Sequence, residues 1–118
     1  MNLEDLEIYR LSINLGENVW KELQVWEPFL KNTLGSQLIR ASDSVTLNIA
    51  EGFGRFTFKE TKRFAYYARG SLFETKACIQ IACKRGIIEE ANYEKFESEI
   101  RNLGVKLNNY IRYLNSKA

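Results

Sequence analysis

The stretch QLIRASDSVTLNIAEGFGR, residues 37–55, decides the fold that this sequence predicts. Its polar residues are spaced four, four and three apart, which places them on one stripe of a helix with 3.6 residues per turn. They are Arg40, Ser44, Asn48 and Glu51. An apolar stripe runs beside them, formed by Leu38, Ala41, Val45 and Ile49. A helix that mixes the two so closely is expected to be buried on both stripes, so its polar groups need partners.

A glycine-rich corner follows this helix. Gly52 is expected to take the left-handed conformation that ends a helix, and Gly54 to keep the corner tight. Thr57 and Glu60 then form a capping box, which predicts a third helix running to about Lys84. Because the two helices fold back on each other, residues whose numbers add to about 114 should lie opposite.

This register predicts a polar seam between the second and third helices. The opposed pairs are Arg40 with Glu74, Ser44 with Gly70, Asn48 with Tyr67 and Glu51 with Arg63. We predict that both oppositely charged pairs lie within ion-pair reach. The seam is either structural or part of a catalytic or ligand site. Losing one member of a buried pair costs ~3–5 kcal/mol, so a structural role alone explains such residues.

Two more helices complete the prediction. The N-terminal helix of the chain runs from about Leu3 to Val25, and Pro28 then interrupts the pattern. The helix already described, second in the chain, begins near Asn32 or Thr33. The last helix starts between positions 89 and 92, with apolar residues at Tyr93, Phe96, Ile100, Leu103, Leu107, Tyr110 and Leu114. No stretch alternates long enough for a strand. The sequence predicts an all-α, antiparallel up-and-down four-helix bundle, with residues 1–118 as a single domain.

The first helix carries two apolar stripes. One is expected to enter the core and consists of Leu6, Tyr9, Ile13, Gly16, Trp20 and Leu23. The other consists of Ile8, Leu11, Leu15 and Val19, and we predict that it forms an oligomer interface, since one stripe suffices for a bundle core. The alternative is a core that wraps widely around this helix.

Composition indicates a globular protein with an uneven charge distribution. The chain of 118 residues has 17 basic and 15 acidic residues, but residues 32–85 alone hold 9 basic and 4 acidic ones. This middle segment is the candidate surface for nucleic acid. No apolar run approaches a membrane span, so no membrane partner is expected. Cys78 and Cys83 are five apart on one helix, which favours two unbridged thiols in a reducing cytoplasm.

The residue types argue against catalysis. The chain has no His, which removes the commonest general base and metal ligand. Its cysteines lack a zinc spacing, and the GFG of residues 52–54 follows a helix and lacks the Lys-Ser/Thr pair of a phosphate loop. Asp43 and Glu51 are two helical turns apart, too far for a close acid pair. We therefore expect no enzyme activity, no cofactor and no metal.

The third helix carries the candidate nucleic-acid face. Lys59, Lys62, Tyr66 and Arg69 are spaced three, four and three apart, so they share its outer side, and Arg55 at the corner is a further candidate. Such cations contact phosphates, and a Tyr stacks on an unpaired base. The alternative is a solvated helix face on a protein-interaction hub, for example one that holds a reverse transcriptase.

The same residues carry a family resemblance. The motifs RASDSVTLNIAEGFGR at Arg40–Arg55 and RFAYYARGSLFE at Arg63–Glu74 resemble the four-helix-bundle proteins encoded in intervening sequences of bacterial 23S rRNA genes. Some of these were labelled ribosomal proteins, and a related branch serves as the accessory protein of diversity-generating retroelements. The resemblance implies a homopentameric ring with a basic surface, proposed to bind RNA or DNA. The chain departs from the family pattern at Asp43, usually small or apolar, and at Thr46, often Pro.

Overall fold

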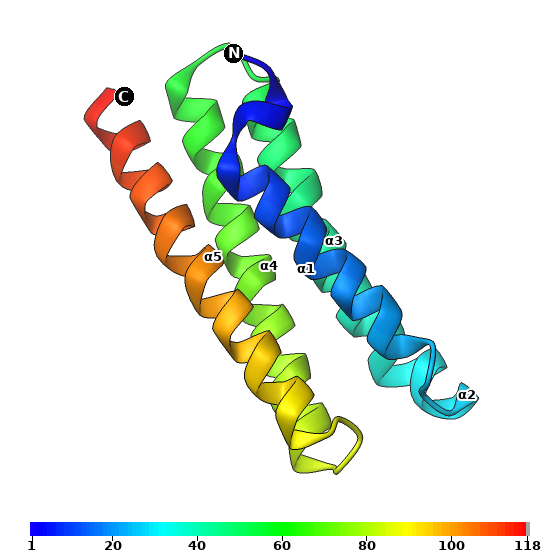
Figure 1. The fold of residues 1–118 in the computed structure, drawn as a ribbon. Helices are drawn as coiled ribbons and strands as arrows, with labels where there is room; N and C mark the ends of the chain where they lie inside the picture. Colours follow the sequence, from blue (N-terminus) through cyan, green and yellow to red (C-terminus); the bar gives the residue numbers. More distant parts are fainter. Residues whose placement is uncertain (118) are drawn as a thin grey trace.

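Four long helices form an antiparallel bundle in the computed structural model, which describes residues 1–117 (Figure 1). They are α1 (Glu7–Leu23), α3 (Ser36–Phe53), α4 (Phe58–Lys84) and α5 (Glu90–Lys117). A short α2 (Pro28–Leu30) connects α1 to α3, and the bundle measures 45 × 22 × 20 Å. The predicted all-α architecture is confirmed. No helix among the described residues is long and apolar enough for a membrane crossing.

The helix ends follow local chemistry, and in these regions one end differs from the sequence prediction. The Glu60 N–H donates to Thr57 Oγ1 over 3.2 Å, as the capping box predicts, and Gly86 has a φ of 71° just beyond α4. The second helix was expected to begin near residues 32–33, but helical structure begins at Pro28 and continues through a π-helical turn, Lys31–Gly35, into α3. Proline is suited to a first helical position because its missing N–H is not needed there.

The core is built from one face of each helix. On α4 it uses small residues at three positions, Ala65, Ala68 and Ala82, together with Leu72 and Ile79. The face predicted for the last helix also holds, since Phe96, Ile100, Leu103, Leu107 and Leu114 are buried. Small side chains on α4 let both of its neighbours approach closely, and α4 packs extensively against α3 on one side and α5 on the other.

The first helix buries residues of both apolar stripes, as in the alternative of a core that wraps widely around it. Ile8, Leu15 and Val19 are buried in the core and Leu11 packs against it half-buried, so the prediction that these four form an exposed oligomer interface is wrong. Trp20 and Ile13, assigned to the core, are exposed by 57% and 38%. Because α1 packs on both α3 and α5, its core face is wide and is centred between the two stripes.

A close approach between α3 and α4 occurs at Gly52. This residue is buried within α3, and neither it nor Gly54 has a positive φ, so the predicted left-handed helix end is wrong. A Cβ atom on Gly52 would lie 2.9 Å from Phe64 Cβ and 3.1 Å from the Thr61 carbonyl oxygen of α4. The Thr61 hydroxyl donates to the Gly52 carbonyl over 2.9 Å. Gly52 is therefore needed because it lacks a side chain.

We predict that Gly52→Ala destabilises the fold by ~1–3 kcal/mol, because the added methyl meets atoms that cannot move without shifting a helix. Gly70→Ala is the matched control. Nothing lies within 4 Å of a Cβ there, so Ala should stabilise α4 by up to ~1 kcal/mol through helix propensity. Urea denaturation of both variants measures the difference. Equal stability of the two variants would contradict the close helix approach.

Candidate nucleic-acid interface

A chain of hydroxyl and amide groups links α3 to α4. Ser71 Oγ donates to Ser44 Oγ over 3.0 Å, and Asn48 Nδ2 donates to the Ser44 carbonyl and hydroxyl oxygens over 2.8 and 3.0 Å. Thr75 Oγ1 extends the chain by donating to the Ser71 carbonyl over 2.8 Å. Ser44 thus meets Ser71 rather than Gly70, which is exposed. The helices are antiparallel in nearly the expected register, and their polar contact consists of uncharged groups.

The two charged pairs predicted across this seam do not form. Arg40, Glu74, Glu51 and Arg63 are all exposed, and no ion pair within 4.0 Å joins Arg40 to Glu74 or Glu51 to Arg63 among residues 1–117. The Arg63 guanidinium instead lies 5.3 Å from the centre of the Phe64 ring. Long side chains at the edge of a helix pair gain more from hydration than from a weak exposed ion pair.

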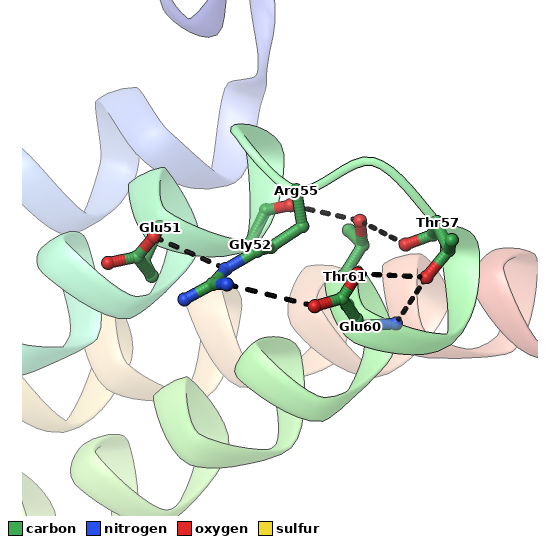
Figure 2. Close-up of polar contacts among 6 residues, drawn as sticks. All are labelled: Glu51, Gly52, Arg55, Thr57, Glu60 and Thr61. Carbon is green, nitrogen blue, oxygen red and sulfur yellow. Dashed lines mark hydrogen bonds and ion pairs between the residues drawn. The ribbon is translucent and has the colours of Figure 1, made fainter.

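Arg55 is held at the corner between α3 and α4 (Figure 2). Its guanidinium lies 3.4 Å from a Glu51 carboxylate oxygen and 3.7 Å from one of Glu60, and 4.7 Å from the centre of the Phe64 ring. Figure 2 shows the side chain extended between the two carboxylates. Arg55 was predicted as a nucleic-acid contact, but its charge is already shared by two acids. Through these two pairs it connects the last turn of α3 to the first turn of α4.

The other predicted contacts lie together on the outer side of α4. Lys59, Tyr66 and Arg69 are exposed and Lys62 is half-buried. The same spacing continues to Phe73, which is 59% exposed, and to Lys76, two residues that the sequence prediction missed. The full set, called the α4 stripe below, is Lys59, Lys62, Tyr66, Arg69, Phe73 and Lys76, and it contains no acidic residue.

A groove between α4 and α5 adjoins the α4 stripe. Arg69, Phe73 and Lys76 line it from α4, while Arg101 and Val105 line it from α5, and its volume is about 250 Å³. The Arg69 guanidinium lies 5.7 Å from the centre of the Phe73 ring. The continued spacing of three and four along residues 59–76 is the sequence signal that would have extended the prediction into this groove.

A second distinctive surface lies on the outer side of α1 and α3. Ile13 on α1 and Leu47 on α3 flank a shallow hollow, and Trp20 lies two helical turns beyond Ile13 on the same side of α1. Leu47 is 67% exposed. We call Ile13, Trp20 and Leu47 the α1–α3 patch.

Asp43 lies in this hollow against Gly16. A Cβ on Gly16 would lie 3.1 Å from Asp43 Oδ1, so the glycine makes room for the carboxylate. Partial burial raises the pKa of the Asp43 carboxyl above its ordinary value of 3.8, and the nearby Glu17 carboxylate raises it further. A charged carboxylate at this position therefore has an electrostatic cost in the folded chain.

These features define a small helical bundle whose interior polar groups serve helix packing and whose outer surface carries cations and aromatic rings. Within residues 1–117, no three acidic or cysteine side chains gather in a way that would hold a metal ion. The match to known families is direct. Residues 4–109 match the family described as 23S rRNA-intervening sequence protein, and the chain belongs to it.

The fold is shared with a solved structure from Bacteroides thetaiotaomicron, described as a protein with unknown function from the S23 ribosomal protein family. The two chains are 16% identical and superpose with a TM-score of 0.80. The comparison covers 89% of this chain and 95% of the other, so nearly the whole bundle is common to both. No curated protein matches the sequence.

We predict that Asp43→Asn stabilises the fold at pH 7 by up to ~1 kcal/mol, since the site is largely open to solvent. A raised pKa means that the neutral carboxyl supports folding fully below pH 3.8, and that this support is lost as the pH rises through the raised value. Wild type and variant should therefore converge in acid. Thermal melts from pH 3 to 8 test this, with the exposed Glu94→Gln as the control for loss of one charge. A constant difference at every pH would contradict it.

Proposed function

We propose that this protein is a non-catalytic, oligomeric protein that binds single-stranded nucleic acid along the α4 stripe. The observation that carries the proposal is the alternation of cations with exposed aromatic rings on one helix face. Proteins that hold single strands combine a positive track for phosphates with rings on which bases stack. Tyr66 and Phe73 are seven residues apart, which on a helix is about 10 Å.

RNA is the first ligand to test. The family's name ties its members to sequences inserted in 23S rRNA, and the most cationic segment of the chain, residues 32–85, includes the α4 stripe. A reducing cytoplasm suits the two free thiols of Cys78 and Cys83. Burial raises the pKa of the Cys78 thiol, and the nearby Glu74 carboxylate raises it further, which keeps the thiol protonated and unreactive.

Oligomerisation would multiply the α4 stripe. We propose that copies of the chain associate through the α1–α3 patch, which replaces the stripe first assigned to that role. Trp20 and Leu47 are more than half exposed in the single chain. Aromatic and large aliphatic side chains of this kind favour burial against a partner. Five copies, the number implied by the family resemblance, would carry five α4 stripes and bind one long strand by multivalency.

A protein partner is the second candidate function. The end of the bundle near the α3–α4 corner has a hollow of about 380 Å³ lined by aromatic side chains, including Phe53, Phe58 and Tyr113. Phe56 at its rim is 100% exposed. An apolar, aromatic hollow at a helix corner favours a protein hub, whereas the α4 stripe favours nucleic acid, so the two functions concern different surfaces.

The triple variant Lys59→Gln, Lys62→Gln and Arg69→Gln should weaken RNA binding at low salt for all sequences alike, since phosphate contacts carry little base information. The slope of log affinity against log salt should become shallower by ~2, at ~0.7 per lost contact. Fluorescence anisotropy with a labelled single strand measures both. The control variant removes three exposed cations toward the opposite end of the bundle and combines Lys21→Gln, Lys84→Gln and Lys95→Gln.

Wild type that binds no strand at low salt would end the nucleic-acid proposal and leave the protein hub as the better candidate. Equal binding by wild type and the triple variant would move the interface away from the α4 stripe. Binding lost equally in the control variant would show that total charge matters rather than this face.

We predict that Trp20→Gln with Leu47→Gln dissociates the oligomer, because two exposed apolar anchors are lost from the α1–α3 patch. The monomer should remain folded with unchanged helicity. Multi-angle light scattering at micromolar concentration gives the mass, with Val25→Gln, 82% exposed outside the patch, as the control. A monomeric wild type would refute oligomerisation. An oligomer of another size would refute only the number five.

A further inference from the structure

The groove between α4 and α5 holds one acidic residue among its cations. Glu97 lines it from α5, one helical turn before Arg101, and its Oε1 atom is buried without a hydrogen-bond partner among residues 1–117. Arg69, Lys76 and Arg101 line the same groove, yet no ion pair within 4.0 Å joins any of them to Glu97. A buried acceptor left unpaired is costly, so a ligand N–H donor in the groove would favour a small turn of the Glu97 side chain that brings this oxygen toward it.

The groove is small and its floor is partly formed by a glycine. Its volume of about 250 Å³ is below the ~300–1,000 Å³ of pockets for drug-sized ligands, which fits one planar ring system rather than a whole cofactor. A Cβ on Gly104 would lie 3.7 Å from Leu72 Cδ2, an ordinary contact distance. The absence of that side chain keeps space open between the exposed Phe73 ring and α5.

We propose that this groove takes a single guanine base of the bound strand, an inference that rests on the proposed function. An ionised carboxylate only accepts hydrogen bonds. Guanine presents two neighbouring N–H donors, N1–H and N2–H₂, on its Watson–Crick edge. Adenine and cytosine place a ring acceptor beside their amino group, and uracil flanks its single N–H with two carbonyl oxygens. The Glu97 carboxylate can therefore accept two neighbouring hydrogen bonds from guanine, but only one from adenine, cytosine or uracil.

The surrounding residues supply the remaining contacts of a nucleotide. The Phe73 ring offers a face for stacking, and the Arg69 guanidinium 5.7 Å from its centre adds a cation beside the stacked base. Lys76 and Arg101 flank the groove from the two helices and provide positive charge for the adjoining phosphates. The α4 stripe leads into the groove at Arg69 and Phe73, so a strand bound on the stripe reaches Glu97 without leaving the cationic surface.

The test compares strands of about eight nucleotides, an oligouridine and the same strand with one guanine, adenine, cytosine or inosine at its centre. Wild type should bind the guanine strand about tenfold more tightly than the adenine, cytosine and uridine strands. Inosine keeps N1–H and lacks the amino group, so its strand should bind with intermediate affinity. The Glu97→Gln variant should lose this preference, because the glutamine amide places an N–H donor against the N–H donors of guanine. The variant should still bind oligouridine.

Gly104→Ala gives an independent test of where the base binds. The added methyl narrows the groove without a clash, so the melting temperature of the variant should not fall. The variant should bind the guanine strand several-fold more weakly than wild type does, and its affinity for oligouridine should be unchanged. Wild type that binds all strands equally overturns the guanine site and leaves the proposed function standing. A preference that persists in Glu97→Gln or is unaffected by Gly104→Ala also overturns it. Absence of any binding at low salt overturns both proposals.

Discussion

The contact between α3 and α4 at Gly52 constrains the rest of the bundle. Main-chain and Cβ atoms of the two helices meet here, and the Thr61 hydroxyl fixes their relative position by donating to the Gly52 carbonyl. Because a helix is rigid, fixing its position against a neighbour at one end also fixes which residues lie opposite each other along the rest of its length. The Ser71–Ser44 hydrogen bond, more than two turns away, has its partners in place as a result. Which residues of α4 face solvent follows from the same register.

The α4 helix has small side chains on the face that packs in the core and large side chains on the face that meets solvent. Its inner face is dominated by small side chains such as Ala65, Ala68 and Ala82, which bring α3 and α5 close. Its outer face carries long cations and aromatic rings, Tyr66 and Phe73 among them. The separation allows the outer face to change without loss of the core, since exposed side chains contribute little to the free energy of unfolding. The proposed binding surface is therefore built on a helix that packs closely against two neighbours.

The sequence predicted the fold well because helical periodicity and caps are local properties. The α5 core face and the Thr57 cap were read correctly from spacing and residue type. The assignment of one α1 stripe to the core and the other to an oligomer interface was wrong. Which residues of α1 are buried depends on the helices that flank it, and the periodicity of the sequence does not identify those neighbours. The predicted charged pairs were wrong for a related reason: a register places Glu51 near Arg63 but does not show that Arg55 is nearer. The absence of a hydrogen-bond partner for Glu97 Oε1 among residues 1–117 results from how α4 and α5 pack, and no pattern in the sequence indicated it.

The bundle is not closed equally on its four sides. The α1–α5 side has the fewest close contacts of the neighbouring helix pairs, and polar bridges span it, with Lys106 Nζ 2.8 Å from Glu7 and Asn18 Nδ2 2.9 Å from Glu99. A hollow of about 380 Å³ lies between these two helices. Partial opening of a protein begins where little apolar surface must be exposed. We therefore expect the bundle to open first on the α1–α5 side, so that amide hydrogens of α1 exchange before those of the α3–α4 hairpin.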